Sequence, residues 1–337
     1  MATGMSELIE IPRETETGRG QRSGASPAFR ADVLEGLAQP QKVIPARWFY
    51  DHRGSELFEE ITRLPEYYPT RTETGILMAH ATRIGRLLGS THYAVVEFGA
   101  GSATKTPLLL DAIWADAYVP IDISGEFLRE SCEVLAQRYP DLAIHPLEAD
   151  FTCPVRLPHE TAGAGRLGFF PGSTIGNLEP YDATELLRSM RATLGTGSYL
   201  LIGFDRIKAE RELVEAYDDA SGVTAAFNLN LATRINRELE GTIPLEHLRH
   251  LARWNAQRSR IEMHLEAKRD IAFEVCGRSV EMARGETIHT ENSHKYDPRS
   301  AATLLLAGGW ETLEHFSDPD GRFMVILARA QGDELVP

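Results

Sequence analysis

The chain has 337 residues, of which 42% are hydrophobic and 25% are charged, as expected for a folded globular protein of about two domains. Its net charge of -14 excludes a nucleic-acid-binding protein, which would need a basic face to neutralise phosphates, and disfavours docking on an anionic membrane. Three scattered cysteines and the lack of a long apolar run predict a cytoplasmic protein without a cysteine-based metal site, and we expect no metal.

The N-terminal part of the sequence predicts a tail followed by helices. Residues 1–27 are polar, rich in Gly, Ser and Thr, and lack the apolar core of a secretory signal, so we expect a mobile tail. Helical periodicity begins in "AFRADVLEGLAQ" (28–39). Two more helices are expected within 55–88, where Pro65 and Pro69 bracket the corner "EYYP".

The middle of the chain predicts a parallel sheet. Strands alternate with helices from "HYAVVEFGAG" (92–101) to "GSYLLIGFD" (197–205), and this rhythm indicates βαβ units covered on both faces. Residues 210–239 then predict one or two long helices, whereas 258–275 alternate as antiparallel strands do. The segment 298–330 predicts a helix, a strand, an Asp-Gly turn and a closing strand.

These elements predict an α/β fold in two parts. We expect a Rossmann-like nucleotide-binding domain from 73–207 and 296–337. We expect a second, α+β domain for the substrate, built from 28–72 and the insertion 208–295.

A cofactor site is predicted at the ends of three successive strands. Gly99 and Gly101 in "VVEFGAGSATKT" lie between a strand and a helix, although the dinucleotide motif lacks its third glycine. Asp122 ends the next strand, where a ribose-binding acid belongs, and Asp150 followed by Phe151 ends the third. This set resembles the class I S-adenosylmethionine-dependent methyltransferases. A NAD-dependent dehydrogenase remains the main alternative.

The stretch "TIHTENSHKY" (287–296) is unusually polar. From composition alone it is either a solvated turn or the wall of a pocket that hydrogen-bonds a small polar ligand. Together with "FYDHRGSELFEEITRLPEYYPTRTE", "GSTIGNLEP", "AYDDASGVTAAFN" and "RIEM", it resembles the histidine Nα-methyltransferase family of ergothioneine biosynthesis. The resemblance runs from about residue 45 to the C-terminus.

The resemblance implies a set of substrate contacts. Tyr67 would bond the imidazole, while Asn177 and Tyr217 would hold the α-amino and carboxylate end. Glu291 and Ser293 would read the two imidazole nitrogens. Each residue taken singly also fits a structural role; Asn177, for example, fits a helix cap.

Further residues are implied around this set. Met263 would pack beside the imidazole ring, and Asn292 would contact the substrate between the two imidazole readers. Tyr50, together with Asn177, would orient the reacting amine. The implied cofactor contacts are Gly99, Gly101, Lys105, Asp122, Asp150 and Phe151.

The resemblance therefore implies methylation of the α-amine of L-histidine by S-adenosylmethionine, three times, giving hercynine. We expect a monomer that binds this small-molecule substrate. The alternatives are a methyltransferase for another amino acid, a NAD-dependent dehydrogenase and a binding module without catalysis.

Overall fold

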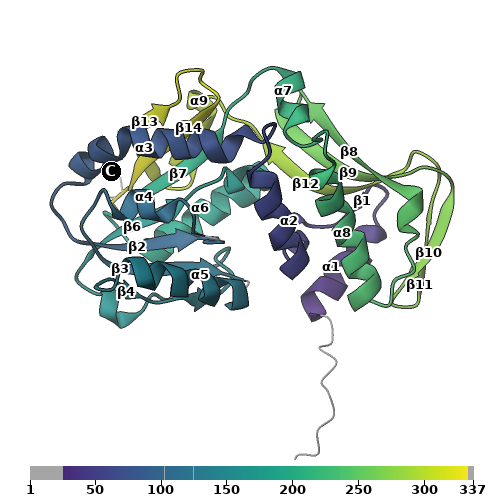
Figure 1. The fold of residues 1–337 in the computed structure, drawn as a ribbon, viewed down its shortest axis with the longest axis horizontal. Helices are drawn as coiled ribbons and strands as arrows, with labels where there is room; N and C mark the ends of the chain where they lie inside the picture. The colour runs from purple at the N-terminus through teal and green to yellow at the C-terminus, as the bar shows by residue number, and fades with distance from the viewer. Residues whose placement is uncertain (1–25, 102, 124, 333–337) are drawn as a thin grey trace, which may run out of the picture.

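The computed structural model describes residues 26–101, 103–123 and 125–332 (Figure 1). The predicted mobile tail, 1–27, lies outside the described residues except for its last two positions.

A large sheet forms one half of the molecule, on the left in Figure 1. Its strand order is β13-β14-β7-β6-β2-β3-β4, with β5 also paired to β3. The pairs among β2 to β7 are parallel, whereas β14 runs antiparallel to both β7 and β13. The bounds are β2 Tyr93–Phe98, β3 Ala115–Asp122, β4 Ala143–Ile144, β5 Leu147–Glu148, β6 Gly165–Phe170, β7 Tyr199–Asp205, β13 Trp310–Ser317 and β14 Phe323–Ala330.

Helices cover both faces of this sheet, because its central strands are apolar on both sides. On one face, α3 (Tyr68–Leu88), α4 (Thr106–Leu110) and α5 (Gly125–Arg138) pack against side chains such as Val95 and Leu201. On the other face, α6 (Pro180–Leu194) and α9 (Pro298–Ala307) pack against Val96 and Ile202. The predicted doubly covered α/β sheet with a closing antiparallel pair is confirmed.

The other half contains a four-stranded sheet in the order β1-β12-β9-β8 and a separate hairpin, β10-β11. The strand bounds are β1 Lys42–Val43, β8 Leu248–Asn255, β9 Arg260–Ala267, β10 Ile271–Val275, β11 Arg278–Met282 and β12 Thr287–His294. Its helices are α1 Pro27–Leu37, α2 His52–Thr62, α7 Glu210–Glu215 and α8 Val223–Glu238. Short 3-10 turns are η1 Ala46–Phe49, η2 His159–Thr161, η3 Thr174–Asn177 and η4 Leu245–His247. One apolar cluster joins α1, α2 and α8 to the sheet.

Some elements differ from the sequence-based expectations. The stretch 287–294 is neither a turn nor a loop but the interior strand β12, paired on both sides. The segment 142–151 forms two very short strands in place of one. The expected boundary between 72 and 73 falls inside α3, and the division into domains stays a prediction.

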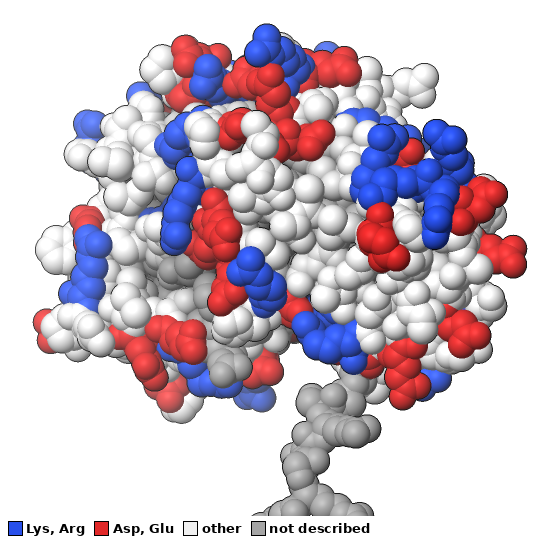
Figure 2. All heavy atoms as spheres, turned by 45° about the vertical axis from the view of Figure 1, so that its right-hand side comes forward, with Lys and Arg blue, Asp and Glu red and all other residues white. Residues whose placement is uncertain are grey.

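The surface carries charges of both signs. On the face shown in Figure 2, basic and acidic side chains are interleaved. None of the helices in the described ranges is long and apolar enough to cross a membrane.

Candidate functional site

The turn after β2 has the backbone of a ligand-binding loop. Gly99 and Gly101 have φ values of +71° and +48°, which a glycine adopts without strain. The Gly101 amide donates to the Asp122 carboxylate at 3.3 Å, so the ends of β2 and β3 adjoin. A Cβ at Gly99 would lie 3.5 Å from the Phe151 ring. The structure thus brings four of the predicted cofactor residues together at the carboxyl edge of the sheet.

Asp150 lies at the same edge but is already bonded. Its carboxylate accepts from the backbone amide of Thr152 at 2.9 Å and from the Thr152 hydroxyl at 2.6 Å. The Phe151 ring contacts Phe98 and Phe170 edge-on, at centroid distances of 6.1 and 6.0 Å. Phe151 is therefore fixed beside the glycine turn, whereas Asp150 is held in a local turn of its own.

Lys105 is tied to a buried carboxylate that the sequence analysis did not identify. Glu73, on α3, is 1% exposed and ion-pairs with Lys105. The Glu73 carboxylate also accepts from the Gly172 amide at 2.9 Å. Lys105 thus joins the glycine turn to α3 and to the loop after β6. No sequence pattern marks Glu73, because its partners lie 32 and 99 positions away.

Aromatic rings form one side of the second part of the site. The Tyr67 and Tyr217 rings meet edge-on at 6.2 Å, and each residue is 8% exposed. The half-buried Tyr50 lies edge-on to Phe58 at 5.7 Å. Burial raises the pKa of Tyr50, Tyr67 and Tyr217 well above the usual value, and the charge of Glu291 adds to each shift. The three phenols are therefore neutral, and each lies within electrostatic range of the Glu291 carboxylate.

Strand β12 presents the predicted imidazole readers on one face. Glu291 and Ser293 are two positions apart, so their side chains point to the same side of the sheet. Glu291 lies opposite Met263 of β9. Glu291 is 9% exposed, and burial raises its pKa to about 7 although Lys295 opposes this shift. The stretch is a buried wall, so the solvated-turn alternative is wrong.

Lys295 stands behind this wall and was not identified from the sequence. Its ammonium donates to the Ser293 hydroxyl at 2.8 Å and to the Tyr217 hydroxyl at 3.0 Å. It also ion-pairs with Asp205 at 2.8 Å. The hydroxyls of Tyr217 and Ser293 bond each other at 2.7 Å. Four side chains thus form one continuous hydrogen-bonded group.

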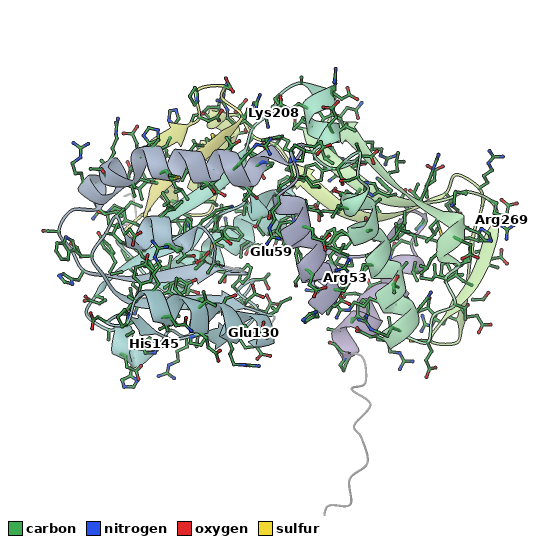
Figure 3. All side chains as sticks on the ribbon, viewed as in Figure 1. Arg53, Glu59, Glu130, His145, Lys208 and Arg269 are labelled. Carbon is green, nitrogen blue, oxygen red and sulfur yellow. The ribbon has the colours of Figure 1, made fainter. Side chains whose placement is uncertain are left out.

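The group extends from Asp205, the last residue of β7, to the start of α3. The Tyr68 hydroxyl donates to Asp205 at 2.7 Å, and Lys208 ion-pairs with Asp205 at 2.6 Å. Figure 3 shows Lys208 where α3 begins. Burial would raise the pKa of Asp205, but Lys295 and Lys208 hold it below the usual value. Burial lowers the pKa of Lys208 to about 8. Asp205 was not identified from the sequence, although its position at the end of an expected strand could have indicated it.

Two predicted residues have different surroundings from the rest. Asn292 lies on the opposite face of β12 from Glu291, and its amide donates to Glu179 at 3.2 Å. The structure therefore does not bring Asn292 to the face of β12 that carries Glu291 and Ser293. Asn177 ends η3, next to β12: a Cβ added at Gly176 would lie 2.7 Å from the carbonyl oxygen of His294.

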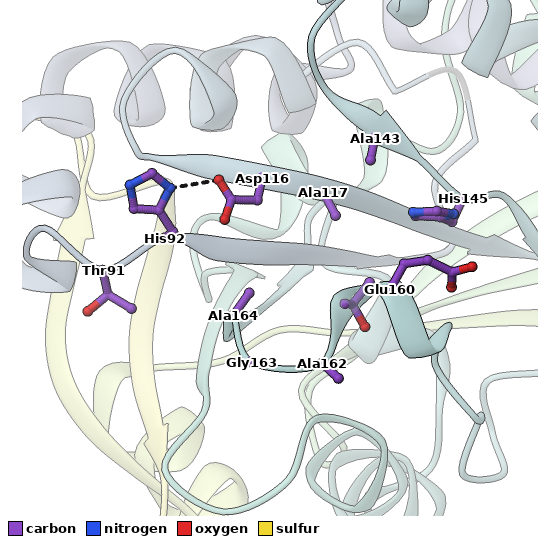
Figure 4. A pocket seen from close by; sticks show the side chains of 11 residues that line it. Thr91, His92, Asp116, Ala117, Ala143, His145, Glu160, Ala162, Gly163 and Ala164 are labelled. Atoms are coloured by element: carbon purple, nitrogen blue, oxygen red, sulfur yellow. Dashed lines mark hydrogen bonds and ion pairs between the residues drawn. The ribbon is translucent and has the colours of Figure 1, made fainter.

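A separate cavity of about 320 Å³ lies at the amino ends of β2 and β3, at the sheet edge opposite the glycine turn (Figure 4). His92 bonds Asp116 there at 2.6 Å. None of the predicted site residues lines this cavity.

A known family and several known proteins match this chain over more than half of its length. The family described as "Histidine-specific methyltransferase, SAM-dependent" matches residues 29–330. A histidine N-alpha-methyltransferase of Mycolicibacterium smegmatis is 40% identical over 90% of this chain and 95% of its own length. Its counterpart in Mycobacterium tuberculosis is 38% identical over 89% of this chain and 94% of its own. The ergothioneine biosynthesis protein 1 of Neurospora crassa is 32% identical over 60% of this chain and 24% of that protein.

Proposed function

The chain belongs to the family of histidine-specific, SAM-dependent methyltransferases, and from this premise we propose that it methylates the α-amino nitrogen of L-histidine. We propose three successive transfers that give hercynine, as a step of ergothioneine biosynthesis. The observation that carries the proposal is the buried wall of β12, where a carboxylate and a hydroxyl two positions apart face three neutral phenols.

The glycine turn fits S-adenosylmethionine, which would supply the activated methyl group. Gly99 lacks a Cβ where a ligand would approach the backbone, and the flat Phe151 ring beyond it suits an adenine. Asp122 places a carboxylate at the end of β3, where it would accept from ribose hydroxyls. Gly101 would contact the cofactor through its backbone. Lys105, held in place by its ion pair with Glu73, would contact the cofactor through its side chain.

The β12 wall would recognise the imidazole. Glu291 would accept from one ring N–H, and Ser293 would meet the other nitrogen. The Glu291 carboxylate is buried, so a ligand without a matching N–H would leave it unpaired, at a cost of about 1–3 kcal/mol. Met263, opposite Glu291 on β9, would pack against the ring. Tyr67 lies at this wall through its contact with Tyr217.

The amino-acid end would lie toward the methyltransferase sheet. Asn177 and Tyr50 would orient the α-amine, and Tyr217 would donate to the α-carboxylate. Holding the nitrogen about 3–3.5 Å from the reacting carbon would be the main contribution of these residues to the rate. Neutral phenols suit a product that becomes a permanent cation, because aromatic faces attract quaternary ammonium groups.

We infer a small-molecule enzyme that acts as a monomer in the cytoplasm and binds no nucleic acid. The interleaved surface charges and the net charge of -14 support this inference, because a nucleic-acid-binding face would be basic. The three cysteines are all free, which suits a reducing compartment.

A mass-spectrometric assay tests the proposal. The protein is incubated with S-adenosylmethionine and each of the common L-amino acids, and methyl gains are counted. We expect three methyl groups on histidine and none on the others. Absence of methylated histidine, or faster methylation of another amino acid, would show the substrate assignment to be wrong.

A further inference from the structure

Each N–H group of the Lys295 ammonium donates a hydrogen bond to another side chain of the protein. Lysine has three N–H donors, and three acceptors lie around Lys295: Asp205 at 2.8 Å, Ser293 at 2.8 Å and Tyr217 at 3.0 Å. The side chain is 0% exposed. Lys295 therefore cannot donate to a ligand directly without losing one of these bonds, and any influence on a ligand passes through its neighbours.

Of the two hydroxyl protons next to Lys295, one is not used in a hydrogen bond within this group. Tyr217 and Ser293 carry one hydroxyl proton each, and one of these protons joins the two oxygens at 2.7 Å. Lys295 has no lone pair and occupies an acceptor position on both oxygens. Among the described residues neither hydroxyl has a further hydrogen-bond acceptor, so the remaining proton is free to meet a ligand. Because an ammonium polarises both oxygens, this proton forms a stronger hydrogen bond than an isolated hydroxyl would.

The charges behind the hydroxyls favour an anion as the acceptor. Lys295 and Lys208 share the single carboxylate of Asp205, so these three side chains carry one excess positive charge, which Glu212 and Glu291 offset only from a distance. Lys208 and Asp205 have side-chain exposures of only 9% and 1%. A buried excess charge is costly until an opposite charge meets it. Among the described residues, Glu291 forms no ion pair with either lysine, and it lies on the imidazole side.

Tyr217 is the hydroxyl placed to deliver that proton. As whole residues, Tyr217 is 8% exposed and Ser293 is 2% exposed, so Tyr217 is the less deeply buried of the two. The Lys295 ammonium also lies 4.6 Å from the centre of the Tyr217 ring, which holds this ring against the charge. When Ser293 donates to Tyr217, the spare proton is that of the phenol, and Ser293 keeps a lone pair for the imidazole side.

We propose that Lys295 is a positioning residue that selects substrates with a free α-carboxylate, acting through the Tyr217 hydroxyl. This inference rests on the proposed function, since it assumes a histidine-like substrate whose carboxylate meets Tyr217. It assigns carboxylate selectivity to a lysine that touches no part of the substrate.

The test compares L-histidine with L-histidinamide, which keeps the ring and amine but lacks the negative charge. The ratio of kcat/KM values for the two substrates is measured in wild type and in Lys295→Met. We expect wild type to prefer histidine by at least about 30-fold and Lys295→Met to lower this preference at least about tenfold, since tenfold corresponds to about 1.4 kcal/mol. A general loss of stability would lower both rates and leave the ratio unchanged.

Lys208→Met is the matched control. Lys208 pairs with the same carboxylate, Asp205, and contacts Tyr68, but it does not contact Tyr217 or Ser293. Its substitution removes an equal charge and should change the preference less than about threefold. An equal drop in both variants would overturn the proposal, because a general field and not the Lys295–Tyr217 contact would then set the selectivity.

If Lys295→Met does not fold, the same ratio of kcat/KM values is measured in Tyr217→Phe. This variant removes the proposed relay and should lower the preference as strongly as Lys295→Met, whereas Ser293→Ala should retain it. An unchanged preference in Tyr217→Phe would overturn the inference while wild-type methylation of histidine still stands. Failure of wild type to methylate histidine at all would instead overturn the proposed function.

Discussion

At the scale of single residues, the site is built from ionisable groups in places where ionisable groups are costly. Glu291 is 9% exposed, and its neighbours are phenols, not cations in direct contact. Its raised pKa of about 7 measures the cost of keeping its charge there. Such a residue reduces the stability of the ligand-free protein and is retained when binding requires it.

Replacing Glu291 by Gln should therefore stabilise the protein and damage the enzyme. Because the pKa of Glu291 in the folded protein is raised, wild-type stability falls as pH rises from about 4 through 7, whereas Gln does not titrate. We expect equal melting temperatures at pH 4 and a more stable variant at pH 8, by on the order of 2–3 kcal/mol. The KM for histidine should rise about 10- to 100-fold, as for a lost charge-assisted bond. A variant that is less stable at pH 8 would contradict the assigned burial cost.

The sequence indicated the polar residues of the site better than it indicated the distant side chains that hydrogen-bond to them. Glu291 and Ser293 stand out because a polar run is unusual between apolar segments. Lys295 belongs to the same run, yet its role depends on Asp205, 90 positions earlier, and on Tyr217. Nothing in a local pattern indicates which distant side chain completes a hydrogen-bonded group.

At the scale of elements, β12 carries different chemistry on its two faces. Glu291 and Ser293 face the phenols, while Asn292 donates to Glu179 on the other side. The alternation of a strand thus explains why one of three consecutive polar residues leaves the imidazole wall. The sequence analysis grouped all three because it did not treat 287–294 as a strand. The turn η3, which carries Asn177, packs directly against β12.

The contact between η3 and β12 predicts the effect of one methyl group. In Gly176→Ala, the new Cβ would lie 2.7 Å from the His294 carbonyl oxygen and 3.2 Å from its amide nitrogen, both parts of the backbone. The turn must move away from β12, and this movement displaces Asn177, which is proposed to orient the amine. We expect kcat to fall at least about tenfold, since a shift of about 1 Å can cost about 100-fold.

The control for this experiment is Gly75→Ala on α3, where a Cβ would meet nothing within 4 Å. It should leave kcat unchanged and stabilise the helix by up to about 1 kcal/mol. Wild-type kcat in Gly176→Ala would mean that the turn tolerates displacement and that Asn177 does not orient the amine.

At the scale of the whole molecule, the sequence predicted the large sheet better than the small one. Apolar strands and helices alternate from β2 to β7, and that local rhythm determines a parallel sheet almost by itself. The small sheet instead joins β1 to β12, whose paired residues Lys42 and Ile288 are far apart in the chain. A two-residue strand such as β1 is too short to show periodicity, so it can be recognised only from its pairing with β12 in the structure.

Ion pairs also join the small sheet to the start of α6 in the other half of the molecule. Arg260 of β9 pairs with Glu262 and with Glu179, which precedes α6. Arg260→Met would leave Glu262 with only part of its compensation, so we expect a loss of about 3 kcal/mol in unfolding free energy at pH 7. Arg253→Met is the control, because Arg253 also pairs with Glu262 but is half-exposed, and it should cost under about 1 kcal/mol. Chemical denaturation measures both.

The pH dependence of this loss separates charge from packing. Burial would raise the pKa of Glu262, but Asn255, Arg260 and Arg253 hold it well below the usual range. A depressed carboxyl pKa gives stability that is present above about pH 4 and disappears as the pH falls further. The difference between wild type and Arg260→Met should therefore shrink on acidification toward pH 2. A constant difference would assign it to packing.

The pairing of β1 with β12 determines how late in synthesis the small sheet can form. Strands β2 to β7, which supply the cofactor turn, have all been synthesised once residue 205 is added. Lys42 and Val43 must wait for Ile288 and His289, so the imidazole wall is among the last parts to form. A nascent chain thus holds the parallel strands of its cofactor half before β12, with Glu291 and Ser293, has been made. The proposed imidazole readers thus join the fold only when the polypeptide is nearly finished.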